Sequence, residues 1–157
     1  MSGDVSMRRS QAIQRLPTNS VFGTLILHDG ERSEALLFIP LGEDITQLVS
    51  SGAPFVPTIR DARFCLVARD AIAAIRVTAG GTDEPADNDL PIRRQRARIR
   101  LRSGTTLDGE LQWTPLRDHE RTSDHANETA SFLVIHDAET RSSYYIVKSQ
   151  IATIEEL

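Results

Sequence analysis

Six arginines lie within the eleven residues from Ile92 to Arg102, and no acidic residue separates them. They are Arg93, Arg94, Arg96, Arg98, Arg100 and Arg102. Alternate residues of a strand share a face, so the even-numbered arginines follow one another at about 6.6 Å while Ala97, Ile99 and Leu101 face a core. Arginine side chains bind phosphate or carboxylate oxygens with paired N–H groups. This segment is therefore a candidate surface for a phosphate ligand or an acidic protein partner.

The same row has a second interpretation that needs no ligand. Acidic residues of this chain can neutralise the arginines from neighbouring strands, because cross-strand charge pairs are common in sheets. The candidates for this role are Asp108, Glu110, Glu155 and Glu156. The sequence leaves both interpretations open.

Arg94 and Arg98 form an RxxxR pattern just ahead of a predicted barrel strand. This pattern resembles the first motif of PilZ domains, which implies binding of cyclic di-GMP. The partner motif of that family, an Asp or Asn with Ser and Gly on the next strands, is absent from GTTLDGELQW at residues 104–113. The net charge of −4 disfavours non-specific duplex binding. Binding of RNA or a phosphate ligand such as cyclic di-GMP through the arginine strand is the alternative function.

Residues that could support catalysis or metal binding are dispersed. The four histidines are scattered along the chain at His28, His119, His125 and His136. Cys65, the only cysteine, lies in an apolar segment, where packing explains it better than reactivity. The common nucleophile, phosphate-loop and zinc-protease motifs are missing. We therefore expect no enzyme activity, no cofactor and no metal site.

The placement of the protein in the cell follows from what the sequence lacks. A single cysteine cannot form an internal disulfide, which agrees with a reducing compartment. No apolar segment follows the N-terminal arginines, and no apolar run approaches the roughly 20 residues of a membrane span. We expect a cytoplasmic protein without a membrane span.

The elements that position these residues form an internal repeat. GTLILHDG at residues 23–30 matches ARIRLRSG at 97–104, and CLVARDAIAAI at 65–75 matches YYIVKSQIATI at 144–154. One extra residue in the second turn aligns ALLFIPL at 35–41 with ELQWTPL at 110–116, which pairs Leu36 with Leu111 and Phe38 with Trp113. Each copy predicts five short strands.

The repeat divides the chain into four parts. We expect a disordered N-terminal arm over residues 1–20, a first unit over 21–77, an acidic linker over 78–91 and a second unit over 92–157. In the first unit, GEDITQLVSSG at residues 42–52 predicts a short amphipathic helix. The corresponding polar segment at 117–130 predicts a loop. Five short strands leave unpaired edges when flat, so each unit is expected to curl into a small β-barrel.

This pattern resembles the Sm-like small β-barrel. The match lies in RIRLRSGTTLDGELQW at 98–113 and in Gly104, Gly109 and the final isoleucines, and it implies a mainly β fold of two tandem five-stranded barrels. The second strand departs from the asparagine-centred motif that holds uridines in Sm proteins, and IVKSQI at 146–151 lacks the tyrosine-lysine-histidine of bacterial Hfq. The segment from Ile39 to Ala62 also resembles an uncharacterised bacterial small-barrel domain family. Both resemblances imply a fold without an activity.

Candidate contact residues complete the prediction. In the first unit the positions that match the arginines are Phe22, Thr24, Ile26 and His28, and the apolar Phe22 and Ile26 indicate that this strand packs against the other barrel or another subunit. We expect paired barrels that bury Phe22 and Ile26. Tyr144 and Tyr145 are adjacent and point to opposite faces, so one exposed ring is expected, and Tyr145 is a candidate interface residue. The sequence favours a non-catalytic interaction or scaffold module of a bacterial cytoplasmic assembly, with a protein partner or homo-oligomer.

Overall fold

The computed structural model describes residues 18–50, 52–78, 91–115 and 120–157. The first unit contains five strands: β1 (Thr18–Leu27), β2 (Arg32–Pro40), β3 (Phe55–Arg60), β4 (Arg63–Ala68) and β5 (Ile72–Thr78). The second unit contains five more: β6 (Arg93–Leu101), β7 (Thr106–Trp113), β8 (Phe132–Asp137), β9 (Ser142–Val147) and β10 (Ile151–Glu156). The mainly β class is confirmed. β1 begins inside the predicted arm, while the rest of that arm and most of the linker lie outside the described residues.

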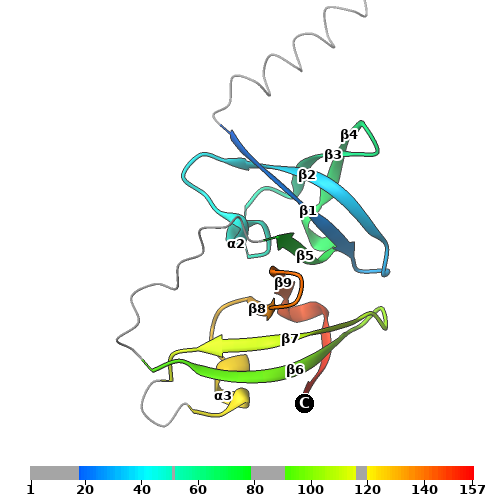
Figure 1. The fold of residues 1–157 in the computed structure, drawn as a ribbon. Helices are drawn as coiled ribbons and strands as arrows, with labels where there is room; N and C mark the ends of the chain where they lie inside the picture. Colours follow the sequence, from blue (N-terminus) through cyan, green and yellow to red (C-terminus); the bar gives the residue numbers. More distant parts are fainter. Residues whose placement is uncertain (1–17, 51, 79–90, 116–119) are drawn as a thin grey trace, which may run out of the picture.

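The ten strands join in one open antiparallel sheet. Their order is β10-β6-β7-β8-β9-β5-β1-β2-β3-β4, so each unit repeats the same order of last, first, second, third and fourth strand. The two units meet where β5 pairs with β9, in the middle of Figure 1. This junction leaves β4 and β10 as the two edge strands of the sheet.

The registers correct one part of the predicted repeat. Gly23 pairs with Ala35 in the first unit, and Ala97 pairs with Gly109 in the second, so β2 and β7 correspond without an extra residue in the turn. Leu111 is therefore equivalent to Leu37 and not to the predicted Leu36. The burial agrees, because the side chains of Leu37 and Leu111 are both fully buried.

The later strands are displaced by a constant amount. β4 and β9 begin at residues 63 and 142, and β5 and β10 begin at 72 and 151, so both pairs are separated by 79 residues. The 3-10 turns between them, η1 (Arg69–Ala71) and η2 (Lys148–Gln150), keep the same spacing. Both final strands also carry a register shift at the equivalent place, opposite the end of β1 or β6. The repeat is therefore structural as well as sequential.

One short helix lies between the second and third strands of each unit. α2 (Ile45–Leu48) is confirmed, and it begins with a capping box at Asp44. The Asp44 N–H donates to Gln47 Oε1 at 2.9 Å, and the Asp44 carboxylate accepts from the Thr46 N–H at 2.9 Å. α3 (Thr122–Ala126) lies in the segment predicted as a loop, so that prediction is wrong for these five residues. No helix in the described part of the chain has the length and apolar character needed to cross a membrane.

Candidate functional site

The arginine strand β6 has the predicted alternation. Ala97, Ile99 and Leu101 are fully or almost fully buried, whereas the even-numbered arginines between and beside them are exposed. Successive side chains of a strand point to opposite faces, so the apolar residues pack on the core while the arginines remain in water. β6 lies between β7 and β10, so acidic residues of both neighbours flank the arginines.

Two of the arginines are paired with carboxylates of the same chain. Arg98 donates two hydrogen bonds to Asp108, at 2.8 and 3.0 Å, and Arg94 lies 3.7 Å from Glu110. The Asp108 hydrogen bond and charge, with Glu155 on the β10 side, raise the pKa of Arg98. The Arg98 hydrogen bond and charge lower the pKa of Asp108. Both arginines of the RxxxR pattern therefore have internal anionic partners.

The remaining arginines of the strand differ in their contacts. Arg102 donates from Nε to the Ser149 carbonyl at 2.6 Å. Arg93, Arg96 and Arg100 form no ion pair with any residue in the described ranges. Acidic residues of the same chain thus neutralise Arg94 and Arg98, and the charges of the other exposed arginines face solvent.

The internal junction between the units is a strand pair with a defined register. Ala74, Ile75 and Arg76 of β5 lie opposite Ile146, Tyr145 and Tyr144 of β9, respectively. The Arg76 Nε donates to Ser142 Oγ at 3.1 Å, and its guanidinium carbon lies 6.0 Å from the centre of the Tyr144 ring. Main-chain pairing and a cationic side chain together hold the two units.

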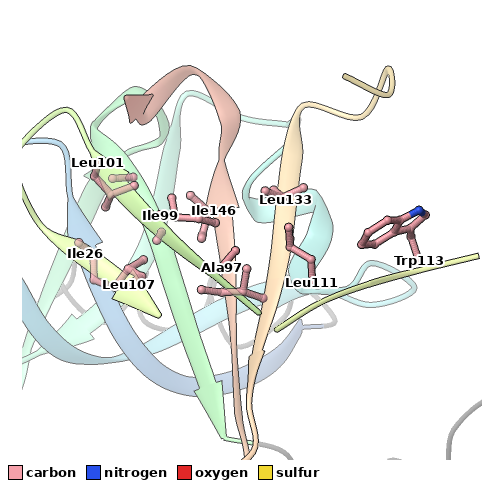
Figure 2. Close-up of a cluster of buried hydrophobic side chains, with 12 residues drawn as sticks. Ile26, Ala97, Ile99, Leu101, Leu107, Leu111, Trp113, Leu133 and Ile146 are labelled. Carbon is pink, nitrogen blue, oxygen red and sulfur yellow. The ribbon is translucent and has the colours of Figure 1, made fainter. Parts of the chain in front are cut away.

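Each unit completes the hydrophobic core of the other at this junction. Ile26, Ala73 and Ala74 of the first unit belong to the core cluster of the second. Figure 2 shows Ile26 beside Leu107 in that cluster. In return, three residues of the second unit pack against the core of the first: Phe132, Tyr145 and Val147. The predicted burial of Ile26 against the other unit is therefore confirmed.

Phe22 differs from Ile26. Its side chain is 65% exposed, so the predicted burial of Phe22 between the units is wrong. The physical reason is its place on β1: Thr24 to Leu27 pair with β5 at the junction, whereas Phe22 lies beyond that paired segment. Tyr145 is half-buried and packs against the first core, so it too serves the internal junction.

Comparison with protein families, curated proteins and solved structures finds no match. The contacts of this chain are therefore the basis for assigning a function. These contacts indicate the two edge strands, β4 and β10, as the candidate site, which the sequence does not predict.

The edge strands expose the residues whose counterparts are covered at the internal junction. Leu66 on β4 is 54% exposed, whereas Tyr145, 79 residues later, packs against the first core. Ile154 on β10 is only partly buried, whereas the equivalent Ile75 has no exposed surface. β10 and β4 are thus the equivalents of β5 and β9, the two strands that pair at the internal junction, but within one chain they lie at opposite ends of the sheet.

Phe55 on β3 follows the same rule. β3 and β8 begin at residues 55 and 132, so Phe55 corresponds to Phe132. Phe132 packs on the first core, but Phe55 is 56% exposed. The 79-residue spacing was visible in the sequence and placed Leu66 with Tyr145, but only the sheet order shows which of the two is covered.

Two basic residues at the 3-10 turns are occupied by main-chain acceptors. Arg69 donates to the carbonyls of Ala53, Gln47 and Leu48, at 2.8, 2.8 and 2.6 Å. Its repeat counterpart, Lys148, donates to the Glu128 carbonyl at 2.8 Å. Burial lowers the pKa of both side chains. These cations fix the loops that contain the short helices.

A groove of about 910 Å³ lies beside Trp113 and α3. Arg93 and Arg121 line it together with Asp124 and Glu156, so both signs of charge are present. The residues in the described ranges form no group of three or more side chains suited to hold a metal ion. The groove has no arrangement that points to one ligand.

The Trp113–His125 stack predicts a pH-dependent stability. The rings lie 4.9 Å apart and nearly parallel, and burial lowers the pKa of His125. His125 therefore binds a proton more readily in the unfolded chain than in the folded one. The free energy of unfolding should fall as the pH drops through the ordinary histidine pKa of about 6.5. Denaturant titrations at pH 7.5 and 5.5 should show a smaller loss for His125→Phe than for the native chain.

Glu128 provides the matched variant, because its carboxylate opposes the lowering of the His125 pKa. Glu128→Gln should enlarge the loss of stability between pH 7.5 and 5.5. An identical pH dependence in all three chains contradicts the role assigned to His125.

Proposed function

We propose that the protein is a non-catalytic assembly module whose copies join head to tail, with β10 of one copy pairing with β4 of the next. The supporting observation is the internal junction: β5 pairs with β9, and β10 and β4 are the repeat equivalents of those two strands. The same proposal retains an Sm-like small barrel as the fold of each unit, supported by the repeated strand order, and a bacterial cytoplasmic setting.

The internal register specifies the register between copies. Moving each internal pair by 79 residues places Thr153, Ile154 and Glu155 of one copy opposite Val67, Leu66 and Cys65 of the next. Backbone N–H and C=O groups along both edges then acquire antiparallel partners. A strand edge that is long and partly apolar otherwise favours uncontrolled pairing.

Side-chain chemistry supports this register. At the internal junction Arg76 donates to Ser142. The equivalent positions between copies hold Glu155 and Arg63, which places opposite charges where the internal junction has its hydrogen bond. Leu66 would cover Ile154 as Tyr145 covers Ile75, and Phe55 would pack on the second core as Phe132 packs on the first.

The contact is heterologous, because two different edges meet. Each added copy therefore exposes another free β4 or β10, and the products are rings when the rotation closes and filaments when it does not. Such an architecture presents many copies of a binding surface, which is the property of a scaffold.

A cysteine introduced opposite Cys65 tests the register. Cys65 is the only cysteine, and the Cα atoms of directly opposed residues in antiparallel strands lie about 4.5–5.5 Å apart, within the range that a disulfide spans. Glu155→Cys should therefore form disulfide-linked multimers under mild oxidation, visible on a non-reducing gel. The series should continue beyond dimers because each copy offers both partners.

Two controls make this result specific. Thr153→Cys moves the new thiol two residue pairs along β10, opposite Val67, and should cross-link to Cys65 far more slowly. The double variant Cys65→Ser/Glu155→Cys should yield at most dimers. Equal cross-linking of Glu155→Cys and Thr153→Cys, or dimers alone from Glu155→Cys, contradicts the proposed pairing.

A further inference from the structure

An apolar row crosses the outer face of the first unit. Phe22 on β1 lies opposite Leu36 on β2, Leu36 lies opposite Ile59 on β3, and Ile59 lies opposite Phe64 on β4. Phe22, Ile59 and Phe64 are 65%, 38% and 53% exposed, and Leu36 is partly buried. Directly opposed side chains are close enough to form one continuous patch.

The fold of the unit does not require this row to be apolar. The equivalent residues of the second unit follow the same strand-by-strand pairing and are all polar: Arg96, Glu110, His136 and Ser143. Ser143 Oγ and His136 Nδ1 lie 2.9 Å apart there. The polar row of the second unit is therefore suited to contact with water, whereas the apolar row of the first unit is suited to contact with another apolar surface.

The row is separate from most of the head-to-tail contact. That contact covers Phe55 and Leu66, the counterparts of the two aromatic residues covered at the internal junction. Phe22 lies three strands from the β4 edge, and Ser143, the counterpart of Phe64, keeps part of its surface free at the internal junction. The row thus remains available after strand pairing.

The exposed area suits a small dimer. With about 200 Å² for a full aromatic side chain, the four residues expose roughly 330 Å² of apolar surface. Homodimer contacts are about 65% apolar, so two such faces correspond to about 1,000 Å² of total buried surface. That total is close to the lower limit for a specific interface.

We propose that this row is a second self-association surface, which binds the same row of a second copy about a two-fold axis. The order aromatic, aliphatic, aliphatic, aromatic reads the same from both ends. A two-fold axis between Leu36 and Ile59 places Phe22 on Phe64 of the second copy and Leu36 on its Ile59. An isologous contact needs this self-complementary order, and the charged row of the second unit cannot join it without burying Arg96 and Glu110.

The test uses a chain in which the edge contact is blocked. Thr153 is exposed on β10, and Thr153→Asp places a carboxylate against the apolar core of the next copy. By light scattering over a concentration series, the mass of Thr153→Asp should rise from 17.4 kDa toward twice that value. Adding Phe22→Glu should hold the mass at 17.4 kDa at every concentration, because two carboxylates would enter an apolar contact.

Arg96→Gln, at the equivalent position of the second unit, is the matched control and should leave the dimer of Thr153→Asp intact. Thermal unfolding checks that Phe22→Glu folds, since its side chain is already exposed. A Thr153→Asp chain that stays monomeric, or that binds a different protein through Phe22, overturns this inference without affecting strand pairing. A dimer that survives Phe22→Glu overturns it as well.

Discussion

Ile26→Ala is expected to lower the free energy of unfolding by about 2–5 kcal/mol, the cost of truncating a fully buried isoleucine. Ile26 has no exposed surface and lies in the core cluster of the second unit although β1 belongs to the first. The cavity therefore opens between the units. For a chain of this length the loss corresponds to a drop in melting temperature of roughly 5–15 °C.

Arg100 is the matched control, because it occupies the same repeat position and is exposed. Arg100→Ala should change the free energy of unfolding by no more than about 0.5 kcal/mol. Denaturant titration of both variants measures the difference. Equal effects would mean that the two units do not share a core at Ile26.

The sequence predicts β6 well because its pattern is unambiguous. Arginine alternates with alanine, isoleucine and leucine, so inside and outside separate residue by residue. β1 breaks this rule at the junction, where Leu25 and Ile26 are adjacent and both fully buried. Where β1 lies between the two cores, both of its faces are apolar, so the side chains there do not alternate between polar and apolar. The alternation within one segment of the sequence therefore does not show that a second core covers the strand.

The one-residue error in the repeat has a similar cause. Residues 35–39 are ALLFI, in which neighbouring positions are both apolar, so alignment by residue type does not distinguish Leu36 from Leu37. Only the pairing of Gly23 with Ala35 and of Ala97 with Gly109 separates them. The sequence does not predict α3 because its segment lacks an apolar period; in the structure His125 of α3 stacks on the core residue Trp113.

The candidate site was predicted in part. The arginine strand was located, yet Arg94 and Arg98 have carboxylate partners within the chain. The edge residues Leu66 and Ile154 carry no chemical motif, and their meaning depends on which strands end the sheet. Sheet order is a long-range property, so it does not follow from local sequence patterns.

The head-to-tail contact predicts a complementation result that no symmetric contact can produce. Leu66→Asp blocks the β4 edge, and Thr153→Asp blocks the β10 edge, while each variant keeps the other edge intact. Both substitutions introduce the same charge, so the two blocked edges do not attract each other. Both residues are exposed in the isolated chain, so neither change should disturb its fold.

The most direct measurement is the light-scattering mass of these two variants, alone and mixed in equal amounts, with Phe22→Glu in both to remove the face contact. Each variant alone should have the mass of one chain, 17.4 kDa. The Phe22→Glu chain with unchanged β4 and β10 should form larger assemblies. The mixture should reach twice 17.4 kDa and stop there, because one intact β10 meets one intact β4. A mixture that remains at the mass of one chain, or a single variant that still assembles, contradicts strand pairing between β10 and β4.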